Sequence, residues 1–145
     1  MAQDASVPGD NTVAMLGRAY SLLGFQIVDG VVGAGYPQKP SHSAVFAQIR
    51  PEGNRLTNLA RGANMSLQAM GELVDELEEL GYVERKPDPS DRRAKLIVLT
   101  ERGQECIEAA VITIHDIEGR LDEILGPRGH ASLRRLLSRL LRGMT

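Results

Sequence analysis

The chain has 145 residues, of which 42 % are apolar and only 3 % aromatic, and its formal net charge is −2. This length corresponds to one domain, and the apolar fraction is sufficient for an aliphatic core. No apolar run reaches the roughly 18 residues of a membrane span. The first residues lack the basic start and apolar stretch of a signal peptide, so we expect a cytoplasmic protein. The single cysteine, Cys106, excludes an intrachain disulfide and a CxxC metal site.

The N-terminal third is predicted to form one long helix and one short helix. Residues 1–10 are polar, and we expect them to be disordered. Residues 33–40 contain glycines and prolines and predict a loop. Ser41 is the predicted N-cap of a short helix through Ile49. From residue 11 to about 32, apolar residues recur at steps of three and four, which predicts a helix with a coiled-coil-like stripe: Val13, Leu16, Tyr20, Leu23, Ile27 and Val31.

The next segment has the pattern of a helix-turn-helix. Thr57 is a predicted N-cap for a helix that ends at Arg61 or Gly62, and residues 63–65 form the turn. Ser66 then caps a helix over residues 67–80, which Gly81 ends. Two helices separated by a short turn are typical of this motif.

A short β-ribbon is predicted to follow, with strands at residues 83–86 and 95–99. Pro87 and Pro89 cannot donate ladder hydrogen bonds, so we expect pairing to stop there. Residues 90–93 would form a polar tip that carries two arginines. A cationic ribbon beside a helix-turn-helix is suited to gripping a nucleic-acid backbone or minor groove.

The C-terminal part is predicted to be helical. Thr100 caps a long helix to about Leu125, the Gly126–Pro127 pair breaks it, and a last helix runs to about Leu141. These helices and the first one carry more aliphatic surface than a small winged domain covers. The excess favours packing against a second chain, while the alternative is a monomeric helical bundle.

The spacing Asp91-x-Arg93, five residues, then Leu99-Thr100 resembles the wing signature of the MarR family of transcription regulators. The similarity extends from about Leu56 to Gly103. It implies a mainly α fold with a small β-wing, as one domain over residues 11–145. In that domain the winged helix-turn-helix covers 41–99, and the dimerisation helices cover 11–33 and 100–145. It also implies a homodimer that presents two recognition helices to a palindromic DNA site, more often as a repressor.

DNA contacts are expected from the start of the second helix of the motif and from the wing. Only the N-terminal end of a recognition helix normally reaches base edges, where glutamine pairs with adenine and glutamate with cytosine. The resemblance implies that a wing arginine, Arg92 or Arg93, enters the minor groove, and that Asp91 steadies an arginine. The predicted DNA-binding set is Ser66, Gln68, Ala69, Gly71, Glu72, Arg85, Lys86, Arg92, Arg93 and Lys95.

The charge distribution leaves a second function open. Residues 56–100 contain six basic and eight acidic side chains, with the bases on the wing and the acids on one helix. A routine DNA-binding domain is more often basic. The alternative is a dimeric winged-helix module that binds a protein partner through its acidic helix.

The resemblance also implies a small anionic or aromatic effector, bound between the dimerisation helices and the winged domain. The candidate lining is aromatic or basic, with core packing as the alternative role. Cys106 is expected to be a buried, inert thiol. The three histidines show no ligand spacing, and no nucleophile–base pair occurs, so we expect neither metal, cofactor nor enzyme activity. The candidate effector residues are Tyr20, Phe25, Tyr36, His42 and Phe46.

Overall fold

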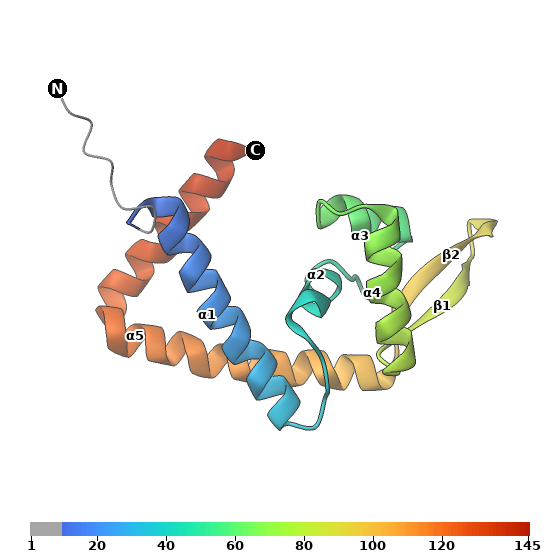
Figure 1. The fold of residues 1–145 in the computed structure, drawn as a ribbon, viewed down its shortest axis with the longest axis horizontal. Helices are drawn as coiled ribbons and strands as arrows, with labels where there is room; N and C mark the ends of the chain where they lie inside the picture. The colour runs from blue at the N-terminus through green and yellow to red at the C-terminus, as the bar shows by residue number, and fades with distance from the viewer. Residues whose placement is uncertain (1–9) are drawn as a thin grey trace. The chain divides into compact units, whose positions relative to one another are not determined.

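The computed structural model describes residues 10–145, so the predicted disordered segment, residues 1–10, lies outside the described residues except for Asp10. It is mostly helical with one two-stranded sheet, as predicted (Figure 1). It divides into a first unit that ends at Ala110 and a second unit, Val111–Thr145. The elements are α1 (Thr12–Gly33), the 3₁₀ turn η1 (Pro40–His42), α2 (Ser43–Phe46), α3 (Leu56–Gly62), α4 (Leu67–Glu79), β1 (Val83–Asp88), β2 (Asp91–Leu99) and α5 (Glu101–Met144).

The predicted start of the short helix after α1 is wrong. The 3₁₀ turn η1 begins at Pro40, and α2 follows from Ser43 to Phe46, three residues short of the predicted end. Proline favours the first helical position because its φ is fixed there and it has no N–H to satisfy. The Ser43 hydroxyl donates to the Pro40 carbonyl at 2.7 Å, so the serine that stabilises this turn directly follows it and does not precede it.

The helix-turn-helix is confirmed as α3 and α4, with one cap misplaced. Arg55, not Thr57, precedes the helix in extended conformation, and α3 starts at Leu56. Asn64 adopts φ 54° in the turn, a left-handed conformation that asparagine tolerates. The Ser66 hydroxyl accepts from the Ala69 N–H at 3.1 Å, which confirms the predicted cap of α4.

The core of the first unit lies under α4. The apolar residues of this helix recur at helical spacing and are buried, while Gln68, Glu72 and Glu79 are exposed. Burying each large aliphatic side chain stabilises the fold by about 1.5–3 kcal/mol. The core consists of Val31, Val45, Leu59, Ala60, Met70, Leu73, Val74, Leu77, Tyr82, Val83, Ile97 and Cys106.

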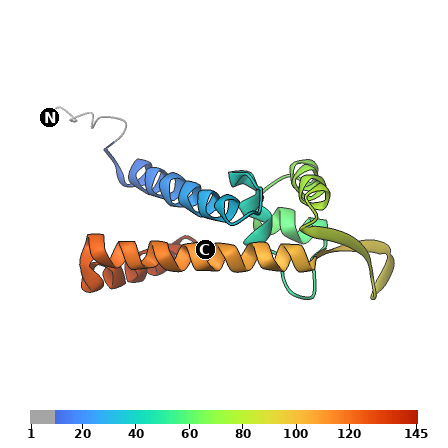
Figure 2. The same ribbon diagram turned by 90° about the horizontal axis from the view of Figure 1, so that it is seen from below.

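The β-ribbon is longer than predicted. Strands β1 and β2 pair from Val83↔Leu99 to Pro87↔Lys95 and, after an irregularity, at Asp88↔Asp91. Pairing does not stop at Pro87, because each strand of a two-stranded ribbon has an open edge where proline is tolerated. Arg92 and Arg93 therefore belong to β2. In both ribbon views the strands project from the helix-turn-helix as a wing (Figures 1 and 2).

Helix α5 begins and breaks where the sequence predicts. The Thr100 hydroxyl accepts from the Gly103 N–H at 3.0 Å. Gly126 has φ 72° and ψ 155°, outside helical values, and Pro127 follows it. In the second unit the buried His130 lies across this break, with Nδ1 at 2.8 Å from Asp122 and Nε2 at 3.2 Å from Glu118.

Large apolar side chains remain exposed on α1 and α5. On α1, Val13, Tyr20 and Phe25 are 80 %, 74 % and 67 % exposed, and on α5 Ile112 and Leu141 are 65 % and 67 % exposed. Monomeric proteins rarely leave so many apolar groups in water. None of the helices in residues 10–145 is long and apolar enough to span a membrane.

Candidate nucleic-acid interface

The start of α4 presents a small polar surface. Ser66, Gln68 and Glu72 are exposed, whereas Ala69 and Gly71 are half-buried. The Gln68 amide lies 3.5 Å from the Glu72 carboxylate, at the limit of a hydrogen bond. All five predicted residues therefore lie at the N-cap or on the first two turns of α4. The side chains of Gln68 and Glu72 are the two that could reach base edges.

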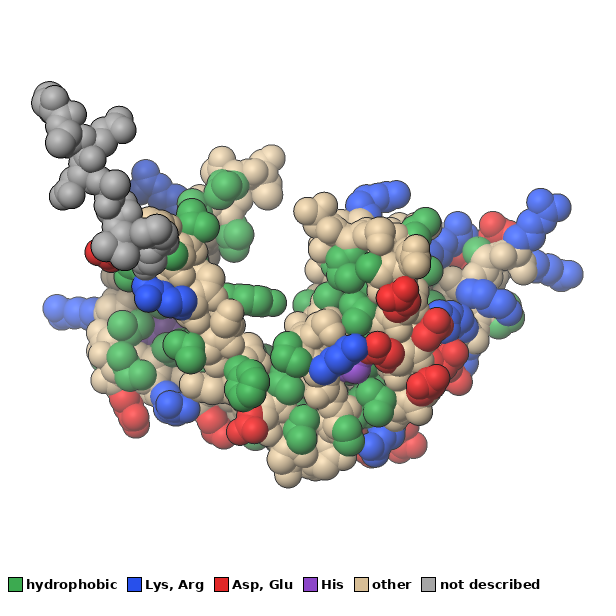
Figure 3. Space-filling view, viewed as in Figure 1, with side chains coloured by type: hydrophobic (Ala, Val, Ile, Leu, Met, Phe, Trp, Pro, Cys, Tyr) green, Lys and Arg blue, Asp and Glu red, His purple; other side chains and the backbone are tan. Residues whose placement is uncertain are grey.

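The wing carries cations without acidic partners. Arg92, Arg93 and Lys95 are exposed, and among residues 10–145 none of them lies within ion-pair distance of a carboxylate. Figure 3 shows basic side chains projecting at the free end of the wing. Asp91 accepts a hydrogen bond at 3.0 Å from the backbone N–H of Arg93. Its predicted bracing of an arginine side chain stays a prediction.

A buried carboxylate at the wing joins it to α3, which the sequence analysis missed. Nε and Nη2 of Arg55 both lie 2.8 Å from Oδ2 of Asp88, which is 7 % exposed. The other oxygen, Oδ1, accepts from the backbone N–H of Ser90 at 2.9 Å and from its hydroxyl at 2.8 Å. The two Ser90 bonds and then Arg55 lower the pKa of Asp88 below its ordinary range. The Asp-Pro-Ser turn was visible in the sequence, but a partner 33 residues away was not.

Two acids of α4 share one arginine of the wing. Arg85 donates through Nη2 to Asp75 at 2.7 Å and through Nη1 to Glu78 at 3.0 Å. Lys86 lies 3.1 Å from Glu84 on the same strand. Arg85 and Lys86 were both predicted to contact phosphate, and both have acidic partners in this structure. Arg85 thus ties β1 to α4.

A third acid of α4 is neutralised from the opposite side. Oε2 of Glu76 lies 2.7 Å from Lys39 Nζ and 2.7 Å from Nε2 of the buried His42. Nδ1 of His42 accepts from the Lys39 N–H at 3.2 Å, so the proton on Nε2 is the one donated to Glu76. The bonds from Lys39 and then His42 lower the pKa of Glu76. Both ring nitrogens of His42 are thus engaged within the protein.

The predicted effector residues separate into two groups. Tyr20 and Phe25 are exposed on α1, away from any aromatic partner among residues 10–145. Tyr36 and Phe46 meet around the buried Tyr82. The Phe46 and Tyr82 ring centroids are 5.9 Å apart, and one cation, the Arg102 guanidinium, lies 5.4 Å from the ring centroids of both tyrosines. Tyr82 was not among the predicted effector residues.

Cys106 lies beside this aromatic cluster and is buried, as predicted. Burial raises the pKa of its thiol to about 11. Its sulfur lies 3.8 Å from the Gln38 side-chain oxygen. A thiol with this pKa is almost entirely protonated at neutral pH and is a poor nucleophile. No cluster of three or more His, Cys, Asp or Glu side chains within residues 10–145 is arranged to hold a metal ion.

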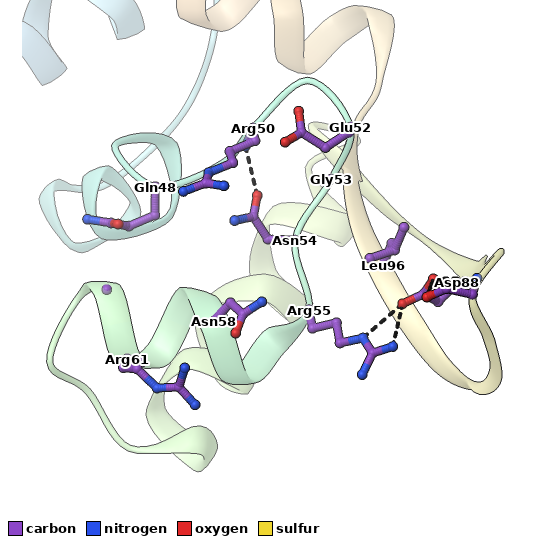
Figure 4. Close-up of a pocket in the computed structure, with 12 residues that line it drawn as sticks. Gln48, Arg50, Glu52, Gly53, Asn54, Arg55, Asn58, Arg61, Asp88 and Leu96 are labelled. Carbon is purple, nitrogen blue, oxygen red and sulfur yellow. Dashed lines mark hydrogen bonds and ion pairs between the residues drawn. The ribbon is translucent and has the colours of Figure 1, made fainter.

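A groove opens between α3 and the wing (Figure 4). Its volume is about 490 Å³. Arginines and side-chain amides dominate its lining, and it was not predicted. The lining residues are Gln48, Arg50, Glu52, Gly53, Asn54, Arg55, Asn58, Arg61, Gly62, Asp88, Ser90 and Leu96.

The two-helix motif, the paired strands and the cationic wing define a winged helix-turn-helix protein. Residues 51–95 of this chain match the sequence pattern of the MarR family. YdcH, an uncharacterized HTH-type transcriptional regulator of Bacillus subtilis (strain 168), is 35 % identical over 60 residues, which is 41 % of either chain. The aligned segment thus spans less than half of this curated relative.

Two solved structures extend the similarity to nearly the whole chain. CouR, a transcriptional repressor bound to a 23-mer DNA duplex, has a TM-score of 0.74 at 24 % identity, covering 92 % of this chain and 94 % of that one. CouR from Rhodococcus jostii RHA1, bound to p-coumaroyl-CoA, has a TM-score of 0.71 at 28 % identity, covering 94 % and 95 %. The chain has a winged helix-turn-helix fold, and the match over residues 51–95, the curated relative and the solved structures all indicate similarity to transcriptional regulators of the MarR type.

Proposed function

We propose that this protein is a sequence-specific DNA-binding transcription regulator, acting as a repressor. The observation that carries the proposal is the exposed cation set of the wing, Arg92, Arg93 and Lys95, beside the polar start of α4. Cations without acidic partners are available to DNA phosphates and the minor groove, and Gln68 is available to base edges. A similar protein, CouR, is a repressor bound to DNA.

Two copies are proposed to bind one palindromic site. The exposed apolar residues of α1 and α5 supply a surface for the second copy. An isologous dimer presents two α4 helices related by a two-fold axis, which matches half-sites about one DNA turn apart.

Binding is proposed to respond to a small anionic or aromatic effector. Arg102 with the rings of Tyr36 and Tyr82 offers a cation beside two aromatic faces. CouR, which this chain resembles, binds the aromatic thioester p-coumaroyl-CoA. An effector that binds better to a dimer with misplaced α4 helices lowers operator affinity by shifting the population.

The rival function, a module that binds a protein partner through an acidic α4, receives less support. Asp75, Glu76 and Glu78 already have cationic partners within the chain. Glu72 and Glu79 remain exposed. Two separated carboxylates are a weak basis for recognising a basic partner.

The test is DNA binding by the wing variant Arg92→Ala/Arg93→Ala, on duplexes selected from a random pool. We expect weaker binding, with the slope of log affinity against log salt smaller by about 2–4, because the dimer loses up to about four phosphate contacts and each removes about 0.9 from the slope. The control is Arg139→Ala, an exposed arginine of the second unit. An unchanged salt slope in the wing variant would reject wing contact.

Base readout is tested separately with Gln68→Ala. This variant should lose about 1–3 kcal/mol of discrimination between the selected site and a random duplex, with little change in random-duplex affinity. Equal loss on both duplexes would reject a role in reading bases. Sedimentation at micromolar concentration tests the dimer in the same samples.

A further inference from the structure

The groove between α3 and the wing has a charge character unlike the rest of the chain. The whole chain carries a formal charge of −2, whereas the groove is lined by three arginines and two acids. One of the acids, Asp88, is already held by Arg55 and Ser90. This leaves Arg50 and Arg61 against the single exposed carboxylate of Glu52.

Arg50 and Arg61 are available to a ligand. Both are exposed, and among residues 10–145 neither guanidinium has an ion-pair or hydrogen-bond partner. Figure 4 shows Arg61 on α3 and Arg50 on the segment that faces it, with Asn58 of α3 also lining the space. Guanidinium groups donate paired hydrogen bonds to phosphate oxygens, and the Asn58 amide supplies a further neutral donor.

The groove is bounded by the two parts of the chain that are proposed to read DNA. Arg61 and Gly62 lie at the end of α3, just before the turn into α4, and Asp88 and Ser90 lie at the turn of the wing. A recognition helix in the major groove and a wing in the adjacent minor groove have one sugar–phosphate strand between them. Phosphate is therefore the ligand chemistry that both the charge and the position of this groove favour.

We propose that the α3–wing groove is a phosphate-binding site in which Arg50 and Arg61 hold the phosphate oxygens. The phosphate belongs either to the duplex backbone or to a free phosphorylated compound. Only the duplex source rests on the proposed function. Arg55 is excluded from the ligand set because Asp88 holds its guanidinium. The groove volume of about 490 Å³ is sufficient for a free phosphorylated compound.

The test compares the full-length protein with Arg50→Gln/Arg61→Gln and with the control Arg139→Gln, which changes an exposed arginine outside the groove lining. The first arm titrates pyrophosphate and inorganic phosphate into each protein without DNA, by calorimetry at fixed ionic strength. The second arm measures the salt slope of duplex binding. Circular dichroism melting confirms that the variants fold, which we expect because both arginines lack partners among the described residues.

If the duplex is the source, the groove variant lowers the salt slope by about 2–4, since each of the two copies loses up to about two phosphate contacts, and the control does not. If a free compound is the source, pyrophosphate binds the parent protein and the control at least about tenfold more tightly than the groove variant. A groove variant that matches the parent in both arms overturns the proposal, as does a parent protein that binds neither a duplex nor pyrophosphate. A parent protein that binds no duplex refutes the proposed function, and the pyrophosphate arm then decides the groove alone.

Discussion

Replacing Gly103 by alanine should destabilise the protein because α5 passes very close to the backbone of Tyr82. A Cβ at position 103 would lie 2.0 Å from the Tyr82 carbonyl oxygen and 3.0 Å from Leu99 Cδ2. Carbon atoms in contact normally lie about 3.5–4.0 Å apart. The carbonyl accepts from the Thr100 N–H at 3.0 Å, so moving it away breaks that bond. Overpacking lowers the free energy of unfolding by about 1–3 kcal/mol, and a lost hydrogen bond lowers it by about 1 kcal/mol. Replacing a helical glycine by alanine raises it by up to about 1 kcal/mol.

We therefore expect Gly103→Ala to lower the free energy of unfolding by about 1–3 kcal/mol. The assay is urea denaturation followed by circular dichroism, at one fixed protein concentration because the proposed dimer would contribute to stability. Gly143→Ala is the matched control, since a Cβ there meets nothing within 4 Å. Its free energy of unfolding should stay equal or rise by up to about 1 kcal/mol. A Gly103 variant as stable as this control would refute the close approach of α5 to Tyr82.

Tyr82→Phe should lower the free energy of unfolding by about 1–3 kcal/mol, because its buried hydroxyl donates to the Pro37 carbonyl at 2.7 Å. Tyr20→Phe, at a 74 % exposed ring, should change it by less than about 0.5; equal effects would contradict this role. Cys106, with a pKa of about 11, should react with iodoacetamide at pH 8 far more slowly than glutathione, and equal rates would show an accessible thiolate. The lowered pKa of Asp88 stabilises the fold above the ordinary carboxyl range, and that contribution is lost as pH falls through the folded pKa. Asp88→Asn should flatten the acid limb of a pH-dependent unfolding series below about pH 4, and an unchanged limb would show that Asp88 is not linked to folding.

Elements whose boundaries depend on neighbouring residues were predicted from the sequence. Ser66 and Thr100 cap α4 and α5 through side-chain bonds to N–H groups three residues ahead. Gly126 breaks α5 by its own backbone conformation. Such signals are contained in a few consecutive residues, so reading them requires no knowledge of the tertiary fold.

Boundaries that depend on distant partners were missed. The sequence favoured Thr57 as the cap of α3, but Arg55 takes that position while its guanidinium is held by Asp88 of β1. The wing was predicted too short because strand pairing was expected to stop at Pro87, as it would in a central strand. In both cases the deciding contact joins segments that only the fold brings together.

In the candidate site, too, the residue types could be predicted from the sequence but their ion-pair partners could not. These ion pairs change the expected electrostatic interaction with DNA. The sequence count for residues 56–100, eight acids against six bases, speaks against binding a polyanion. In the structure five of those acids have a cationic partner, three of them on α4. Four of the six bases, Arg61, Arg92, Arg93 and Lys95, have no acidic partner among the described residues.

A paired charge acts on a distant phosphate as a dipole, whose field falls off faster than that of a single charge, and salt screens it within about 8–10 Å. The field that a bound duplex would meet is therefore set mainly by the charges that lack partners. Among the described residues 56–100, the unpaired cations lie on the wing and at the end of α3, and the unpaired acids are Glu72, Glu79 and Asp91. An acidic total charge is therefore compatible with the proposed DNA binding, because three of the five acids of α4, Asp75, Glu76 and Glu78, are paired with Lys39 or Arg85 within the chain.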